Sequence, residues 1–229
     1  MSRAARIQLM SADGHRFSAW RADPAGPARG GIVILHAVYG LTDHMGDVCD
    51  GYAARGYAAI APALYDRLQP GMVHAYTAAG VTAGSAAYAA LTREQILADV
   101  AACAGALRGD GGAPRKVAIS GFCTGGTWAW IAAAELPFDA QVNFYGSQVP
   151  AHLDRLPRCP TLMHYGDSDH VVSVERIARI RAAVPDAELH VYPGGQHAFF
   201  NPQQASYDAA HAALAMDRTI AFLDRQLGA

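Results

Sequence analysis

The sequence predicts an α/β fold: a mostly parallel, doubly wound sheet with helices on both faces. Strand-like apolar runs alternate with helix-like stretches along most of the chain, a pattern typical of such sheets. Several of these runs are continuously apolar, as expected of strands buried on both faces. No internal repeat, low-complexity tract or linker divides the 229 residues, so we expect one domain spanning 1–229.

An antiparallel hairpin is expected at one edge of the sheet. Two short polar–apolar alternations, residues 6–10 and 15–20, flank the turn-forming Ala12-Asp13-Gly14. Residues 31–35 then form a continuous apolar run, which predicts the first strand buried on both faces.

Beyond this point the chain alternates helices and strands. Thr92, with Gln95 three residues later, is a helix-start signal for a helix that runs to about residue 107. A long segment rich in Ala, Gly and Tyr that ends near residue 90 is either a pocket-lining excursion or a loosely packed helix. The other expected elements are a helix over about 43–55, strands 57–60 and 116–119, a helix after Gly126, strands 140–144 and 161–164, a helix near 174–184, strand 188–192 and a final helix from about 206.

Charge and hydropathy narrow the class of partner. The formal net charge is −2, and the sequence has no basic block that could attract nucleic acid or a membrane surface. The first ten residues lack the apolar core of a signal peptide, and no apolar run is long enough to span a bilayer. We therefore expect the substrate or partner to be a small molecule or another protein, with no nucleic acid and no membrane.

The four cysteines are scattered and form no CxxC pair. This spacing argues against a disulfide framework and against a thiolate zinc site. We expect a protein of a reducing compartment, the cytoplasm, without a metal site.

A thiol lies between glycines where a strand must turn into a helix. Residues 117–130 read VAISGFCTGGTWAW, in which Gly121, Cys123 and Gly125 fit the small-x-nucleophile-x-small pattern of a nucleophile elbow. A tight strand-to-helix turn strains the backbone, so the neighbours two residues away must be small. The N–H groups of the helix that follows lower a thiol pKa and can hold an oxyanion. Cys123 is therefore a candidate nucleophile.

Such a nucleophile requires an acid and then a histidine further along the chain. The turn after strand 161–164 carries two aspartates, of which Asp169 suits the acid better than Asp167, a candidate turn or cap residue. His197 lies in the glycine-rich loop after strand 188–192 and can reach back over the carboxyl edge of the sheet. The remaining histidines show no metal-ligand spacing and are interpreted mostly as polar or packed residues.

At these residues the chain resembles the dienelactone hydrolase family of the α/β-hydrolase superfamily. The resemblance covers almost the whole chain and includes the G-x-C-x-G-G elbow at 121–126, the strand-and-Pro segment at 56–65, the acid turn at 166–170 and the histidine loop at 195–199. It implies an α/β-hydrolase fold and hydrolysis of lactone or ester bonds by a Cys-His-Asp triad, without metal or cofactor.

The resemblance also assigns roles. Cys123 is expected to form a thioester, His197 to move the protons, and Asp169 to orient and stabilise the imidazole. The oxyanion is expected on the N–H of Thr124 and on that of Val38, in the loop 36–40; such donors are commonly worth about 3 kcal/mol each. The candidate substrate-binding residues are Tyr39, Tyr65, Arg67, Tyr145 and Phe199, although so many aromatic residues often belong to a core and solvation is an alternative for Arg67.

Two departures from the family pattern bear on mechanism and substrate. Where the typical member has a glutamate near the thiol, this chain has Ala37, so His197 must activate the thiol, from a resting ion pair. Where the typical member has an arginine that binds the substrate carboxylate, this chain has Asn201, which argues against a carboxylated lactone as substrate.

Three functions follow from these residues. The leading hypothesis is a cysteine-dependent esterase or lactonase acting on a small-molecule ester or lactone. An acyltransferase or thioesterase would use the same acyl-enzyme and differ in what accepts the acyl group. The third is a non-catalytic ligand-binding protein of this fold. The sequence allows either a monomer or a homodimer.

Overall fold

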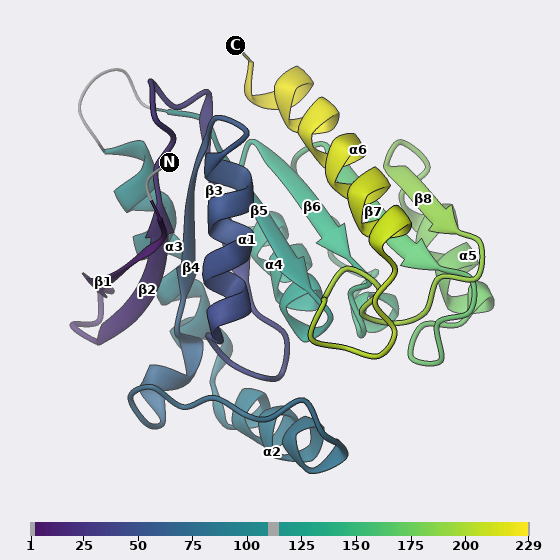
Figure 1. The fold of residues 1–229 in the computed structure, drawn as a ribbon, viewed down its shortest axis with the longest axis horizontal. Coiled ribbons are helices and arrows are strands. Elements are labelled where there is room, and N and C mark those ends of the chain that lie inside the picture. Colours follow the sequence, from purple (N-terminus) through teal and green to yellow (C-terminus); the bar gives the residue numbers. More distant parts are fainter. Residues whose placement is uncertain (1–2, 110–114, 229) are drawn as a thin grey trace. The chain divides into compact units, whose positions relative to one another are not determined.

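The computed structural model describes residues 3–109 and 115–228 (Figure 1). The chain divides into two compact units, one that ends at Ala118 and one that runs from Ile119 to Gly228. Each unit is an α/β arrangement of its own. The expectation of one domain over the whole chain stays a prediction.

The strands of the first unit run in the order β1-β2-β4-β3. β1 (Ala5–Met10) and β2 (Arg16–Ala22) form the expected antiparallel hairpin, and β2 is also antiparallel to β4 (Tyr57–Pro62). β3 (Gly30–Leu35) is parallel to β4, and every residue of both strands is buried. The continuous apolar runs therefore do mark strands covered on both faces.

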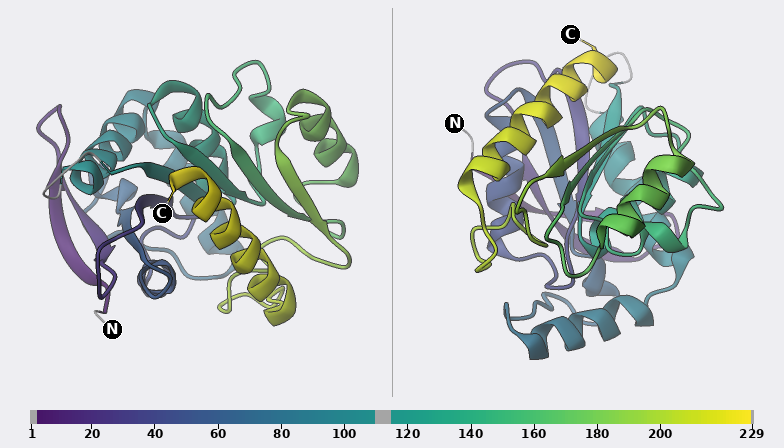
Figure 2. Two further views of the ribbon diagram at one scale, coloured as in Figure 1. Left: turned by 90° about the horizontal axis from the view of Figure 1, so that it is seen from above. Right: turned by 90° about the vertical axis from the view of Figure 1, so that its right-hand side faces the viewer.

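Two helices cover opposite faces of these strands. α1 (Asp43–Ala53) lies on one face and α3 (Arg93–Arg108) on the other (Figures 1 and 2). α3 begins as the sequence predicts: the Gln95 N–H donates to Thr92 Oγ1 at 3.2 Å, and the Thr92 N–H donates to Gln95 Oε1 at 2.9 Å. This reciprocal capping box satisfies two N–H groups that a helix start leaves unpaired.

The segment rich in Ala, Gly and Tyr contains the short 3₁₀ helix η1 (Leu64–Arg67) and helix α2 (Ala78–Ala90). The Thr77 hydroxyl caps α2 by accepting the Gly80 N–H at 3.1 Å. A Cβ added at Gly84 would lie 1.8 Å from the Val38 carbonyl oxygen. The helical alternative is thus correct, but its glycines pack closely on neighbouring backbone rather than loosely.

The strands of the second unit run in the order β5-β6-β7-β8. β5 (Val117–Phe122) enters this unit at Ile119, and β6 (Ala140–Phe144) follows it. β7 (Thr161–Gly166) is parallel to β6 and to β8 (Glu188–Tyr192). This parallel arrangement brings the carboxyl ends of these strands to one edge, where sites in open α/β sheets lie.

Helices also cover both faces of the second unit. α4 (Thr124–Glu135) and α5 (Val174–Ala183) lie on one face, and α6 (Ala209–Leu227) lies on the other (Figure 2). The expected start of the last helix near residue 206 is wrong by three residues. The Asp208 carboxylate accepts the His211 N–H at 3.0 Å and so fixes the first turn at Ala209.

Each unit has its own apolar core. The largest fully buried side chains include Tyr52 and Tyr57 in the first unit, and Trp130 and Phe144 in the second. Among the described residues, no helix combines the length and apolarity that a bilayer crossing requires.

Candidate active site

Cys123 lies at a strained turn between β5 and α4. Its φ of 54° and ψ of −117° lie outside the regions that a residue with a side chain normally adopts. A Cβ at Gly121 would approach the Gly125 carbonyl oxygen to 2.1 Å, and a Cβ at Gly126 would lie 2.9 Å from Gly146 Cα. Backbone contacts therefore require glycine at Gly121, a small position of the motif, and leave little room for a side chain at Gly126.

Asn143, near the end of β6, holds backbone groups beside this turn, and it was not identified from the sequence. Its fully buried amide donates to the Gly126 carbonyl at 2.8 Å and accepts the Gly146 N–H at 2.9 Å. Ser147, which follows Gly146, donates its N–H to the Cys123 carbonyl at 3.2 Å. A polar residue in a buried strand was the available signal, because such a group needs partners, although Gln141 is a second polar residue of the same strand.

Asp169 is the carboxylate that contacts the predicted histidine. Its Oδ2 lies 2.8 Å from Nδ1 of His197, and its Oδ1 accepts the N–H groups of Val171 at 2.7 Å and Val172 at 2.9 Å. The Asp169 side chain is fully buried, and that of His197 is 10% exposed. Three donors thus hold one buried carboxylate in a single orientation.

Asp167, the alternative acid, has a different set of partners. Its exposed carboxylate accepts the Gly194 N–H at 2.7 Å and the Ser168 hydroxyl at 3.0 Å. These bonds tie the acid turn to the histidine loop, the role of a turn residue. A Cβ at Gly166 would lie 1.9 Å from the Gly195 carbonyl oxygen, so the two loops touch at their glycines.

The electrostatics favour the charged forms of all three side chains. Burial opposes ionisation of the Cys123 thiol, but the His197 imidazolium and the donors of Thr124 outweigh burial and lower the thiol pKa. Burial likewise opposes the His197 cation, but the Cys123 thiolate and the Asp169 carboxylate outweigh it and raise the His197 pKa. Burial of Asp169 is outweighed by His197 and two backbone N–H groups, which lower the Asp169 pKa. These shifts all favour an ion pair of thiolate and imidazolium, with the Asp169 carboxylate beside the imidazole.

The outer nitrogen of the imidazole is free for proton transfer. Nε2 of His197 is buried and, within the described residues, makes no hydrogen bond of ordinary geometry. The Cys123 side chain acts on this imidazole by charge and by a hydrogen bond outside that geometry, and both raise the His197 pKa. Cys123 itself keeps partial solvent access, and Thr124 Oγ1 lies 3.9 Å from its sulfur.

Tyr145 and Phe199, both candidates for substrate contact, are almost wholly buried. The Tyr145 ring meets the His197 ring edge-on with centroids 5.0 Å apart, and Phe199 meets Tyr145 at 5.5 Å. Phe199 also contacts Tyr192 at 5.0 Å. Tyr145 therefore packs directly against the imidazole. Phe199 is fully buried between Tyr145 and Tyr192, so it is a core residue in this structure.

The first unit carries Val38, Tyr39 and Tyr65. The Tyr65 hydroxyl donates to the Val38 carbonyl at 3.0 Å and to the Gly84 carbonyl at 2.9 Å, and its ring is buried. Tyr39, half-buried, lies against Tyr76 with ring centroids 4.4 Å apart. Tyr65 therefore supports the loop that contains Val38, and the oxyanion role of Val38 stays a prediction.

The Arg67 side chain is largely buried, and its guanidinium is paired with two carboxylates. Its guanidinium bonds both carboxylate oxygens of Asp99, at 2.8 and 2.9 Å, and also contacts Asp13 at 2.8 Å. The Ser11 hydroxyl donates to the same Asp99 carboxylate. The solvation alternative is wrong, because only 6% of the Arg67 side chain is exposed. The partners were invisible in the sequence because they come from distant segments.

Two buried histidines have structural partners. His164 lies with Nδ1 2.9 Å from the Tyr192 hydroxyl and Nε2 3.1 Å from Thr219 Oγ1. Because the Thr219 hydroxyl donates to the Ala215 carbonyl at 2.8 Å, it accepts from Nε2–H of His164. Burial lowers the pKa of His164 well below its ordinary value and that of His36 to about 4. Burial therefore favours the neutral form of both side chains.

At each of the two positions that depart from the family pattern, the residue makes a local hydrogen bond that involves a backbone group. The Ala37 carbonyl accepts from His36 Nδ1 at 2.7 Å. The Asn201 amide oxygen accepts the Gln203 N–H at 2.9 Å, which makes Asn201 a turn former. Neither position supplies a charged side chain.

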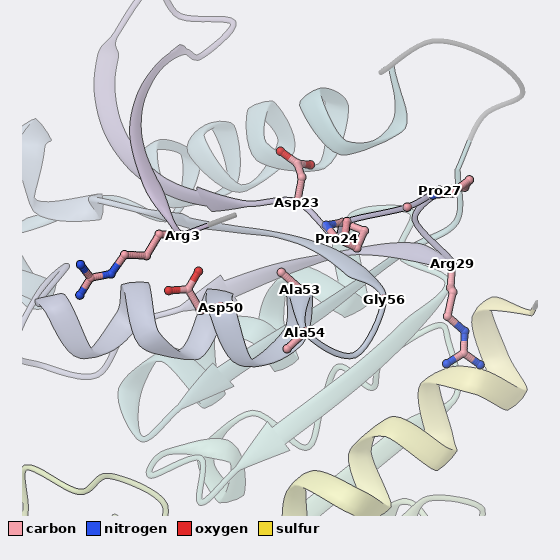
Figure 3. Close-up of a pocket in the computed structure, with 11 residues that line it drawn as sticks. Arg3, Asp23, Pro24, Pro27, Arg29, Asp50, Ala53, Ala54 and Gly56 are labelled. Atoms are coloured by element: carbon pink, nitrogen blue, oxygen red, sulfur yellow. The ribbon is translucent and has the colours of Figure 1, made fainter. Parts of the chain in front are cut away.

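A separate hollow of about 380 Å³ lies in the first unit beside the C-terminal end of α1 (Figure 3). Arg3 and Arg29 both line it, but Figure 3 shows their side chains pointing away from one another. The Asp50 carboxylate in the same wall accepts the Ala4 N–H at 2.6 Å. The two cations do not converge on one point, and no predicted site residue lines this hollow.

Known proteins with the same fold include a Klebsiella pneumoniae subsp. pneumoniae MGH 78578 protein that carries the provisional name of dienelactone hydrolase. Its crystal structure matches with a TM-score of 0.84 and 28% identity, covering 96% of this chain and 99% of that one. A dienelactone hydrolase-like promiscuous phosphotriesterase from metagenomic libraries matches with a TM-score of 0.81 at 22% identity, over 99% of this chain and 100% of that one, which bears on the fold alone. The fold is that of the α/β-hydrolases, as expected.

Sequence comparison gives the family. The dienelactone hydrolase family profile matches residues 17–227. A carboxymethylenebutenolidase of Pseudomonas putida is 32% identical over 225 residues, which cover 95% of this chain and 94% of that protein. The chain belongs to the dienelactone hydrolase family and is a hydrolase of lactone or ester bonds.

Proposed function

We propose that this hydrolase cleaves its lactone or ester substrate through a Cys123-His197-Asp169 triad and a thioester acyl-enzyme. The observation that carries the proposal is the 2.8 Å contact between His197 Nδ1 and Asp169, with an imidazole that lowers the pKa of Cys123 at a strained elbow. Thiolate is the reactive form of cysteine, so a resting ion pair supplies the nucleophile without a further base.

In the first half of the reaction, the Cys123 thiolate attacks the carbonyl carbon and forms a tetrahedral oxyanion. The Thr124 N–H, at the start of α4, and the Val38 N–H are assigned to this oxygen. When the C–O bond breaks, the His197 imidazolium gives its Nε2 proton to the leaving oxygen, which in a lactone stays tethered to the acyl group. The products of this half are a thioester and a neutral imidazole.

In the second half, neutral His197 takes a proton from water as the water oxygen attacks the thioester carbonyl. The new tetrahedral intermediate expels the Cys123 thiolate and releases the carboxylic acid product. His197 is again an imidazolium, so the resting ion pair is restored. Asp169 remains ionised throughout and keeps the Nδ1 proton in place.

The proposal is tested by replacing Cys123 with Ala and with Ser and following hydrolysis of an aryl ester. Ala is expected to reduce kcat/KM by at least about 10³-fold because the covalent route is lost. Rapid acid quench and mass spectrometry of the wild-type protein should reveal an acyl group on Cys123. Circular dichroism checks that the variants keep their fold, and full turnover by folded Cys123→Ala would disprove the triad.

We further propose that the substrate lacks a carboxylate near the scissile bond. Asn201 stands where the typical family member has the arginine that binds the substrate carboxylate, and the Asn201 side chain bonds its own turn. A panel of matched lactones and esters, each with and without a free carboxylate, tests this selectivity. A clear preference for the carboxylated members would contradict it.

Acyl transfer is the second candidate function, since the same thioester can react with an alcohol or a thiol. The two are separated by product analysis of wild-type turnover in water containing a competing alcohol or thiol. Hydrolysis predicts the free acid as the main product, whereas a transferase gives mainly the new ester or thioester.

A further inference from the structure

The position of Arg176 near the start of α5 is electrostatically unfavourable unless other contacts compensate the positive charge of its side chain. α5 begins at Val174 with Ser173 as its cap, and the Ser173 hydroxyl accepts the Arg176 N–H at 3.4 Å. Arg176 is therefore in the first turn, where the helix macrodipole disfavours a positive charge. Carbonyl oxygens around the guanidinium are the compensation that the structure provides.

The guanidinium of Arg176 joins two loops of the second unit. Nη1 donates to the Val171 carbonyl at 2.8 Å, and Nη2 donates to the Ser147 carbonyl at 3.3 Å. Val171 belongs to the acid loop, and its N–H holds Asp169 at 2.7 Å. Ser147 belongs to the loop after β6, and its N–H holds the Cys123 carbonyl at 3.2 Å. Each end of the guanidinium thus binds a residue that itself fixes a triad member.

The path between acid and nucleophile is short and polar. From Asp169 it runs through the N–H and the carbonyl of Val171 to Arg176, then through the carbonyl and the N–H of Ser147 to Cys123. The proposed triad makes a second connection, through the His197 ring. A planar guanidinium has two separate N–H edges in fixed geometry, which lets it hold two carbonyls at a set separation.

We infer that Arg176 is a positioning residue, which fixes the acid loop against the support of the nucleophile elbow and so maintains the Asp169-His197-Cys123 alignment. This inference rests on the proposed triad. Misplacement by about 1 Å can cost about 10²-fold in rate, so a residue that touches no substrate can still control kcat. Sequence reasoning could not find it, because an arginine in a surface helix is ordinarily solvated.

The test replaces Arg176 with Gln, whose single amide cannot reach both carbonyls, and uses Arg179→Gln as control. Arg179 is exposed on the same helix, so the control removes the same charge from α5. For Arg176→Gln we expect kcat to fall about 10- to 100-fold with KM changed less than about twofold. The thiolate absorbance of Cys123 should titrate at higher pH, because a loosened Asp169 stabilises the imidazolium less. The control should leave kcat, KM and titration unchanged.

A double-mutant cycle with Asp169→Asn separates alignment from general weakening of the fold. If Arg176 acts through Asp169, adding Arg176→Gln to Asp169→Asn should reduce kcat by less than about twofold. Multiplicative effects would overturn the inference, as would an Arg176→Gln protein with wild-type kcat and thiolate titration. Should Arg176→Gln fail to fold, Arg176→Lys carries the same test. An inactive Cys123→Ala with a fully active Arg176→Gln would remove this inference and leave the triad intact.

Discussion

Replacement of Asp169 by Asn tests the acid of the triad, and the structure gives the expected size of the effect. Asp169 Oδ1 accepts two backbone N–H groups at 2.7 and 2.9 Å, while Oδ2 faces His197 Nδ1 at 2.8 Å. An Asn side chain keeps its oxygen on the two N–H groups and turns its NH₂ toward Nδ1. The imidazole must then accept at Nδ1 and carry its proton on Nε2, which is the wrong tautomer for a base.

The magnitude follows from the bond that is lost. A hydrogen bond to a charged group is worth about 1.5–3 kcal/mol, which corresponds to about 10- to 150-fold in kcat/KM. The tautomer change adds to this, so we expect a loss of about 10²- to 10⁴-fold. The His197 pKa should fall, because one of the anions that raise it is gone.

The assay is aryl ester hydrolysis across a pH range, together with thiolate absorbance, for Asp169→Asn and the matched Asp167→Asn. Asp167 lies in the same turn, but its carboxylate binds Gly194 and Ser168 and is exposed. Asp167→Asn should therefore keep kcat/KM within about threefold. The assignment is refuted if Asp167→Asn loses activity and Asp169→Asn retains it.

Two further predictions concern buried polar groups. Tyr65→Phe leaves the Val38 and Gly84 carbonyls without their shared donor, so the unfolding free energy should fall by about 1–3 kcal/mol in urea titrations; the exposed Tyr207→Phe should change it by less than about 0.5 kcal/mol. For His164 the pKa in the folded state lies below the pKa in the unfolded state. The contribution of this group to the unfolding free energy is therefore fully present above the unfolded-state pKa and is lost as the pH falls below that value. Between about pH 7.5 and about pH 5.5 this one group should cost about 1.4 kcal/mol, measured as the difference in pH slope between wild type and His164→Gln; equal slopes would show that His164 is not neutral in the folded state.

The order of strands and helices was readable from the sequence because burial on both faces produces continuous apolar runs. The run predicted over 31–35 is β3, Gly30–Leu35, which is buried throughout. The strand predicted over 188–192 is β8, which stands last in the strand order and is only partly buried. The strand predicted to end at Ile119 extends to Phe122, because the ladder continues through Gly121 into the elbow. Propensity alone ends a strand at a glycine, whereas pairing in the sheet does not.

The candidate triad residues were found because each follows a strand in a motif with a steric reason. The groups that support them were not found, because their roles arise from contacts distant in sequence. Asn143 lies 17 residues from the Gly126 carbonyl that it binds, and Arg176 lies 29 residues from Ser147. Arg67 pairs with Asp99 across 32 residues. Local pattern therefore predicts where chemistry occurs, whereas only the folded chain shows how side chains are oriented.

Backbone strain in the second unit is concentrated at the site. Outside glycine, the described residues with positive φ are Cys123, Tyr145 and Ala198. Cys123 is the proposed nucleophile, Tyr145 packs its ring on His197, and Ala198 follows His197 directly. Such conformations cost about 1–3 kcal/mol each and persist only where surrounding contacts determine them. The Asn143 and Arg176 bonds are contacts of this kind, and they act on the backbone beside the sulfur and the acid. A site held this way keeps its thiolate oriented before substrate arrives, which is why the positioning groups, and not only the triad, should control the rate.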